Sequence, residues 1–210
     1  MIIAVDGPTA SGKGTVAKAL AERYGLKRLD TGSLYRAVGL AVLDAGGQPS
    51  DPVAAVAAAE ALDLGAIDES RIRSSAAGVA ASHVAAIPEV RAVLRRAQRA
   101  FAADPNGAVL DGRDIGTVIC PAAEVKLFVT ASLEERTRRR HAELSARGEQ
   151  ISFDDLKDQI ADRDQRDMNR KDSPLRQAQG AHLLDTTGLS IEAAAAAAFA
   201  IVDKAIAERG

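Results

Sequence analysis

The sequence has little cysteine, little net charge and no long apolar run, and each shortage excludes a class of protein. A single cysteine, Cys120, permits no disulfide within the chain, which is typical of a reducing compartment. The net charge of −2 argues against a general binder of nucleic acid or anionic membranes, since both depend on a basic surface. No apolar stretch reaches the roughly 18 residues of a membrane span, and the first expected strand begins at Ile2 without a basic leader. We therefore expect a cytoplasmic protein that contacts neither membrane nor nucleic acid.

Aromatic residues are also scarce, at 3%, whereas 47% of the residues are hydrophobic, so the core must be aliphatic and rich in alanine. Short apolar runs alternate with helical patterns along the 210 residues. The expected strands are the short segment 26–30 and the runs 2–5, 108–110, 125–129 and 182–185. This alternation predicts an α/β fold with a parallel five-stranded sheet between two layers of helices. In such sheets the ligand lies beyond the carboxyl ends of the strands.

A glycine-rich stretch follows the first apolar run, and a helix is predicted to begin at about Lys13. The stretch matches the phosphate-binding loop G-x-x-x-x-G-K, except that Gly14 and not Ser or Thr follows the lysine. Glycines let backbone N–H groups face inward as an anion nest at the positive end of the helix, where Lys13 adds a full charge. The alternative is a tight turn with a surface lysine. The predicted triphosphate-binding residues are Gly7, Pro8, Thr9, Ala10, Ser11, Gly12, Lys13, Gly14 and Thr15.

The predicted helix 153–170 carries an apolar stripe at helical spacing that continues into charged residues along the same face. Burying such charges unpaired is costly, so this face is predicted to border a wet or anionic cavity. The charged residues are Arg163, Asp167 and Arg170, with Arg166 adjacent. The alternative is a helix that leaves the core and pairs with itself, because Arg163 and Asp167 are one turn apart.

Charged residues also follow the buried strand 108–110. We expect Asp111 to hold the water shell of Mg²⁺ near the phosphates and Arg113 to clamp a second phosphate. Asp114 is expected to accept a hydrogen bond from an amino group. The alternative is a strand-end turn in which both aspartates accept backbone N–H groups.

Three further expectations concern helices and their ends. Ser33 is predicted to cap a helix that runs to about Asp44, and the segment 63–81 is predicted to be an irregular connection. Ser132 and Glu135 are predicted to form a capping box. The helix behind it carries Arg136, Arg138, Arg139 and Arg140. One or two of these arginines are predicted to close over a transferring phosphoryl group, and the others to form a solvated face.

Several segments together resemble the bacterial cytidylate kinases, a family of nucleoside monophosphate kinases. Gly12-Lys13-Gly14-Thr15 is similar to the loop of the monophosphate kinases in general. The segments similar to the cytidylate kinases are 30–36 (DTGSLYR), 82–91 (SHVAAIPEVR), 111–116 (DGRDIG) and 163–167 (RDQRD). This resemblance covers nearly the whole chain.

The resemblance implies transfer of a phosphoryl group from ATP, carried with Mg²⁺, to CMP or dCMP. By matching positions, the acceptor phosphate is held by Arg36, Arg113 and Arg170, the cytosine is read by Ser82, Arg91 and Asp114, and the sugar region is bound by Arg163 and Asp167. Thr31 and Tyr35 complete the acceptor site. The expected catalytic residues are Lys13, Asp111, Arg113, Arg163 and Arg170, with no metal ligated by the protein alone.

The resemblance also implies a monomer with one P-loop domain made of core, acceptor lobe and lid. The core is 1–36, 104–131 and 171–210, the monophosphate-binding lobe is about 37–103, and the lid is about 132–150. The family's lobe usually includes a small strand-rich segment, for which 63–73 is too short. Two rival functions remain: a kinase for AMP, UMP or a non-nucleotide such as shikimate, and a nucleotide-dependent regulatory switch.

Overall fold

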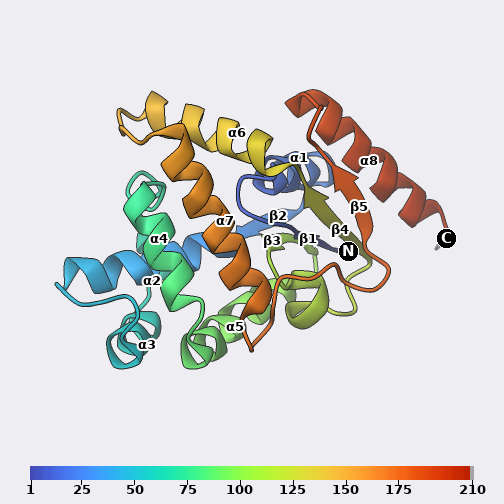
Figure 1. Cartoon of the computed structure of the whole chain (residues 1–210). Helices are drawn as coiled ribbons and strands as arrows, with labels where there is room; N and C mark the ends of the chain where they lie inside the picture. Colours follow the sequence, from blue (N-terminus) through green and yellow to red (C-terminus); the bar gives the residue numbers. More distant parts are fainter. Residues whose placement is uncertain (209–210) are drawn as a thin grey trace.

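The computed structural model describes residues 1–208 of the chain, without the side chain of Leu64. Its five strands are parallel and lie in the order β2-β3-β1-β4-β5, which confirms the predicted sheet (Figure 1). The strands are β1 (Ile2–Asp6), β2 (Lys27–Asp30), β3 (Ala108–Gly112), β4 (Val125–Thr130) and β5 (His182–Asp185). Because β1 lies at the centre, the glycine-rich loop that follows it lies at the middle of the carboxyl edge.

Helices cover both faces of the sheet, as the alternating pattern predicts. Helices α1 (Lys13–Tyr24) and α8 (Ile191–Ala207) pack Val16, Leu20 and Val202 against one face. A short π-helix, η2 (Ile115–Ile119), and the end of α5 (Pro88–Ala102) pack against the other. The three-layer α/β/α arrangement is therefore confirmed.

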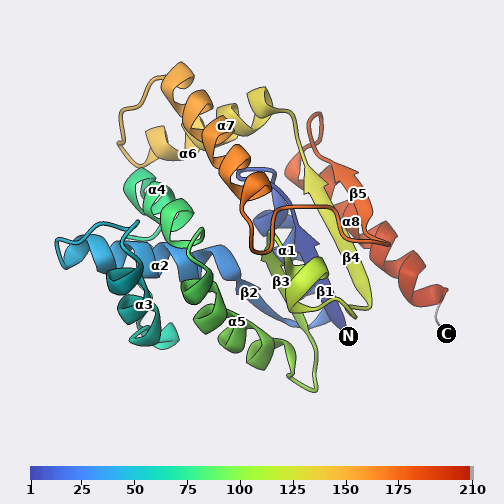
Figure 2. The ribbon, with the colours of Figure 1, turned by 60° about the horizontal axis from the view of Figure 1, so that its bottom comes forward.

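A second hydrophobic cluster holds together the helices beside the sheet. Helices α2 (Thr31–Asp44), α3 (Pro52–Glu60), α4 (Ser75–Val84) and α5 bury Leu34, Val38, Val84 and Leu94 between them. Figure 2 shows α2, α3 and α4 gathered on the side away from α8. At Gly39 of α2 an added Cβ would lie 2.8 Å from the Cβ of Ala80, so α2 and α4 approach too closely for a larger residue.

The prediction for 63–81 is wrong in its second half. The segment contains a short 3-10 helix, η1 (Leu64–Ala66), and turns, but α4 begins at Ser75, and the Ser74 side chain accepts a hydrogen bond from the Ala77 N–H. Its small residues favour a helix once a neighbour such as α2 covers them. Within the described chain no strand lies between residues 63 and 73, in line with the expected departure from the strand-rich lobe.

The prediction for Ser33 is also wrong. Helix α2 begins at Thr31, so Asp30 occupies the N-cap position, and Ser33 lies inside the first turn, where its hydroxyl donates to the Asp30 carbonyl over 2.6 Å. The capping box is half formed. Ser132 accepts from the Glu135 N–H, but the Glu135 carboxylate pairs with Arg139.

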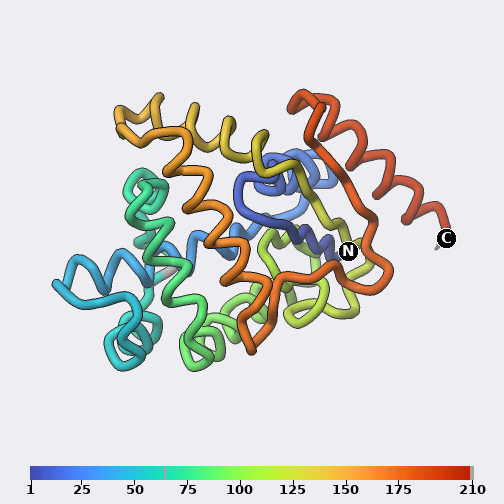
Figure 3. The backbone as a smooth tube through the Cα atoms, viewed as in Figure 1, coloured from blue at the N-terminus to red at the C-terminus, as the bar shows by residue number. Residues whose placement is uncertain are grey.

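Helices α6 (Leu133–Ala146) and α7 (Phe153–Asn169) form a hairpin that packs through Leu144, Leu156 and Ile160. Figure 3 shows α7 running from this hairpin across the front of the molecule, between α4 and the sheet. Among the described residues, no helix taken singly has the length and apolarity to cross a membrane. The bent pair α4 and α5, at 103°, meets that test only when joined.

Candidate active site

A cavity of about 530 Å³ lies at the carboxyl ends of the central strands and is bordered by α2, α4, α6 and α7. Most of the predicted site residues line it. They are Thr9, Ala10, Lys13, Gly14, Thr15, Thr31, Tyr35, Arg36, Ser82, Arg91, Asp111, Arg113, Asp114, Arg163, Asp167 and Arg170. The remaining four, Gly7, Pro8, Ser11 and Gly12, form the loop behind this lining. Residues far apart in the sequence therefore share one cavity.

The loop geometry explains its glycines. A Cβ at Gly7 would lie 2.0 Å from the Val129 carbonyl oxygen, so only glycine permits this approach of loop to β4. Gly12 has a φ of 85° and serves as the N-cap of α1, a left-handed conformation that glycine adopts without strain. The Lys13 ammonium reaches back over the loop and donates to the Pro8 carbonyl over 3.2 Å.

Electrostatics at Lys13 favour an incoming anion. The pKa of Lys13 is lowered to about 7, chiefly by burial and also by the Arg113 charge, while the carboxylates of Asp111 and Asp30 oppose the lowering. A bound anion beside the ammonium favours the charged form. The Lys13 amine is therefore expected to take up a proton when an anionic ligand binds to the loop.

Asp111 has a cationic partner that the sequence analysis missed. Arg28 on β2 donates to the Asp111 carboxylate over 2.9 Å, and a Cβ at Gly14 would lie 3.3 Å from that guanidinium. Arg28 therefore fills the space where most phosphate loops place a hydroxyl side chain. Burial raises the pKa of Asp111 to about 6, Asp30 adds to the rise, and Arg28 and Lys13 counter it. On a four-residue strand the sequence carried no signal that Arg28 points to Asp111.

Arg113 is held from two sides. Its guanidinium donates to Asp167 of α7 over 2.9 Å and to the Thr9 hydroxyl over 2.8 Å. Asp167 also lies 3.7 Å from Arg170. Among the ion pairs of the described residues, Asp167 pairs with these two arginines and not with Arg163, so the Arg163–Asp167 pair of the alternative is not formed, although Asp167 and Arg170 pair at the end of α7.

Arg163 keeps an unpartnered donor at the cavity. Its buried Nε has no hydrogen-bond partner within the described chain, and burial together with Arg113 lowers its pKa to about 10. A buried guanidinium with a free donor fits an anionic or hydroxyl ligand.

Asp114 also lines the cavity and belongs to a buried charge cluster. Its carboxylate accepts a short hydrogen bond from Arg91, which is 1% exposed, and lies 3.8 Å from Arg170. The Arg91 guanidinium lies 5.6 Å from the centre of the Tyr35 ring. The alternative reading, in which both aspartates only accept backbone N–H groups, fails because both pair with arginine side chains.

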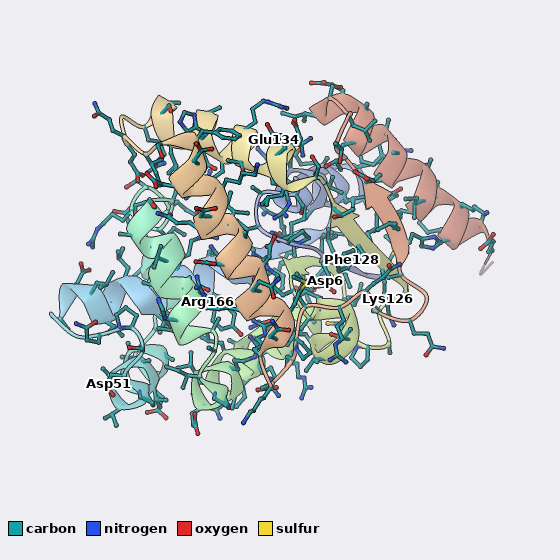
Figure 4. All side chains as sticks on the ribbon, in the orientation of Figure 1. Asp6, Asp51, Lys126, Phe128, Glu134 and Arg166 are labelled. Atoms are coloured by element: carbon teal, nitrogen blue, oxygen red, sulfur yellow. The ribbon has the colours of Figure 1, made fainter. Side chains whose placement is uncertain are left out.

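Two further residues, Ser82 and Asp172, hold arginine side chains near this cluster. The Ser82 hydroxyl accepts from Arg166 over 2.9 Å, and Figure 4 labels Arg166 on α7 facing the lobe. Asp172, which the sequence analysis did not single out, pairs with Arg95 and lies 3.8 Å from Arg91.

The prediction that most arginines of α6 are solvated is wrong. Arg138 is exposed, but Arg136 is buried against Asp164 at 2.7 Å and donates to the Thr9 carbonyl. Arg139 donates to the hydroxyl and carbonyl of Thr186, beyond β5, and Arg140 lines the cavity. Helical periodicity alone does not reveal these partners, since they lie on other elements: Asp164 on α7, Thr9 in the glycine-rich loop and Thr186 after β5.

A phosphate-binding loop facing a wall of arginines, on a three-layer parallel sheet, defines a P-loop phosphotransferase. The comparisons with known proteins specify the family. The family model for cytidylate kinase matches residues 3–204, and the chain belongs to the cytidylate kinase family.

Relatives agree over nearly the full length of the chain. A cytidylate kinase of Xanthobacter autotrophicus is 57% identical over 97% of this chain and 97% of its own. One from Brucella suis is 54% identical over 99% of this chain and 94% of its own. An uncharacterized protein from Eubacterium ventriosum has a similar fold, with a TM-score of 0.56 at 14% identity over 98% of both chains.

Proposed function

We propose that this enzyme transfers the γ-phosphoryl group of ATP to CMP or dCMP, giving ADP and the cytidine diphosphate. The observation that carries the proposal is the cavity in which Lys13 and the arginines 36, 113, 163 and 170 face the Arg91–Asp114 pair. A loop cation at one end and a carboxylate with paired arginines at the other suit a triphosphate, a monophosphate and an amino-bearing base. Membership of the cytidylate kinase family supports the same assignment.

On the donor side, we assign residues 7–15 to the ATP phosphates, with Lys13 on the β- and γ-phosphates. Arg113, which Thr9 and Asp167 hold at the loop, lies where it contacts the transferring group. Positioning and charge neutralisation supply most of the acceleration in phosphoryl transfer, so no side chain is assigned as a general base.

On the acceptor side, Arg36, Arg113 and Arg170 bind the monophosphate, and Arg163 and Asp167 bind the sugar region. Asp114, with Arg91 and Ser82, reads the cytosine amino group, and Thr31 and Tyr35 line the same side of the cavity. Ser82 is 3% exposed and Arg91 1%, so little water reaches these side chains. A mismatched base would therefore leave buried polar groups without hydrogen-bond partners.

The residues present also fit a magnesium ion that arrives with ATP. Within the described chain no three acidic, histidine or cysteine residues cluster as a metal site, whereas Asp30 and Asp111 stand side by side at paired strand ends. Magnesium in such enzymes keeps most of its waters and uses one or two carboxylates with the substrate phosphates. When bound, it neutralises charge on the phosphates, and Asp111 would hold its water shell.

The proposal includes the architecture and setting of the enzyme. Residues 1–36, 104–131 and 171–210 serve as the core, about 37–103 as the acceptor lobe and about 132–150 as the lid. The enzyme acts as a cytoplasmic monomer on small nucleotides and not on nucleic acid. The separate hydrophobic clusters of the sheet and of the lobe support the division between these two parts.

Measuring ADP formation with a panel of acceptors tests the substrate. We expect CMP and dCMP to exceed AMP, UMP and shikimate in kcat/KM. Preference for another acceptor would refute the substrate, and tight ATP binding without transfer to any acceptor would favour the regulatory switch.

Replacing Arg170 by alanine is expected to raise the KM for CMP by roughly 10- to 150-fold, the cost of a lost charge-assisted contact of about 1.5–3 kcal/mol. Its guanidinium carries a buried nitrogen that has no hydrogen-bond partner within the described chain and lies 3.8 Å from the Asp114 carboxylate. Steady-state kinetics with varied CMP measure this. Arg138→Ala is the matched control, because Arg138 is 62% exposed. An unchanged KM would place the acceptor elsewhere.

ATP binding is expected to take up a proton at pH 8. The pKa of Lys13 is lowered to about 7 in the free protein, so the amine is largely neutral at that pH, and the phosphates restore its charge. Titration calorimetry in buffers of different ionisation enthalpy counts the proton, and ATP affinity should fall as pH rises above 7. Loss of the uptake in Lys13→Ala assigns it. Uptake of the same size in that variant would contradict the assignment.

A further inference from the structure

Asp6 is a buried carboxylate that neither the sequence motifs nor the reaction uses. It is the last residue of β1, paired in register with Gly112 of β3 and Phe128 of β4, and it is 3% exposed. Figure 4 labels it beside Phe128 at the sheet. Burial raises the pKa of Asp6 to about 7, and two backbone hydrogen bonds oppose that rise. Because burial disfavours the charged form of this carboxylate, we ask what its contacts do.

The two hydrogen bonds come from the start of η2. The N–H of Ile115 donates to one Asp6 carboxylate oxygen and the N–H of Gly116 to the other, both over 2.8 Å. The first N–H groups of a helix have no partner within it and need a cap. Asp6 therefore caps a helix that belongs to a different strand connection.

The residue at the N-cap position of η2 is Asp114, and it does not use its own side chain as a cap. An aspartate at this position ordinarily accepts from the second or third N–H of its helix. Asp114 instead directs its carboxylate to Arg91 and Arg170. The carboxylate is free to do so because Asp6 already satisfies the amides.

We propose that Asp6 is a positioning residue of the acceptor site: by capping η2 from β1, it releases the Asp114 carboxylate to face the arginines and the acceptor base. Because Asp6 directly precedes the phosphate loop, this contact also joins the donor loop to the acceptor-reading loop. Burial disfavours the charged form of the Asp6 carboxylate in this position, because it raises the pKa of that group. The inference rests on the proposed function for its substrate, and on the hydrogen bonds alone for its structural part.

Asp6→Asn tests the proposal with the shape retained. An asparagine offers one acceptor oxygen and directs an NH₂ group at the second amide, so we expect Asp114 to turn back and cap η2. The KM for CMP should rise about tenfold, the size of one charge-assisted hydrogen bond, with the dissociation constant of ATP within about twofold. Denaturant unfolding of Asp6→Asn at pH 8 is measured beside the kinetics, so that the change in the KM for CMP is compared with any change in stability.

The double variant Asp6→Asn/Asp114→Asn separates positioning from general support. If Asp6 acts through Asp114, adding Asp6→Asn to the Asp114→Asn variant should raise the KM for CMP little further. Additive effects, an equal loss of ATP affinity, or an unchanged KM in Asp6→Asn would each overturn the proposal. Asp51→Asn is the control, because Asp51 caps α3 at the far end of the lobe and asparagine caps equally well (Figure 4).

The hydrogen bonds of Asp6 can also be measured in the wild-type protein, and this result depends neither on how the variant folds nor on which substrate the enzyme uses. Couplings transmitted through hydrogen bonds, measured by NMR, should connect the amide nitrogens of Ile115 and Gly116 to the Asp6 carboxyl carbon. Absence of both couplings would overturn the cap. If CMP proved not to be the acceptor while the couplings were present, the proposed function would fail and the cap would remain.

Discussion

Lys13→Ala is expected to lower kcat by about 10²-fold or more, because positioned charge at the transferring phosphates contributes several kcal/mol to transition-state stabilisation. Residues 7–15 contain no other cationic side chain, and Arg113 and Arg163, whose charges act on Lys13, come from other elements. Initial-rate assays of ADP formation at saturating ATP and CMP measure the change in kcat.

Stability distinguishes this loss from misfolding. The pKa of Lys13 is lowered on folding, so the fold disfavours its charged form at neutral pH, and removing it relieves that cost. We expect the variant to unfold within about 1 kcal/mol of the wild type. Lys204→Ala, at a position 75% exposed on α8, is the control and should leave kcat unchanged. A kcat for Lys13→Ala within threefold of wild type would contradict the role of the loop.

Asp114→Ala is expected to lose both stability and CMP recognition. It leaves Arg91, which is 1% exposed, with only the more distant carboxylate of Asp172 at 3.8 Å, and breaking a buried ion pair costs about 3–5 kcal/mol. Denaturant unfolding measures the first effect, and the KM for CMP measures the second. ATP affinity should stay nearly intact, because the proposed ATP contacts come from residues 7–15 and not from Asp114.

Replacing both partners separates the two effects. Arg91→Met/Asp114→Leu removes the charges together, so much of the lost stability should return while CMP recognition stays lost. A double variant that regained CMP turnover would show that this pair does not read the base. A single variant as stable as wild type would show that the pair is not buried in solution.

Much of this protein could be predicted from the sequence because the decisive signals are local. The order of strands and helices follows from apolar runs and alternation, and the phosphate loop follows from glycine spacing before a lysine. The charged continuation of the α7 stripe likewise placed Arg163, Asp167 and Arg170 at a cavity, because residues three and four apart share a helix face. The local errors, at Ser33 and 75–81, arose where a neighbouring element decided the helix boundary.

Partner choice among charges was not readable in this way. Arg28 joins Asp111 across two strands, Arg139 joins Thr186 from another loop, and Asp6 caps η2 in place of Asp114. Each contact depends on the order and register of the strands, which bring together residues as many as 109 positions apart in the sequence. The sequence by itself determined the fold class, the loop and the set of charged residues. Tertiary structure alone decided which charge faces which, because Coulomb and hydrogen-bond energies depend on separations of a few ångströms that no spacing along the chain encodes.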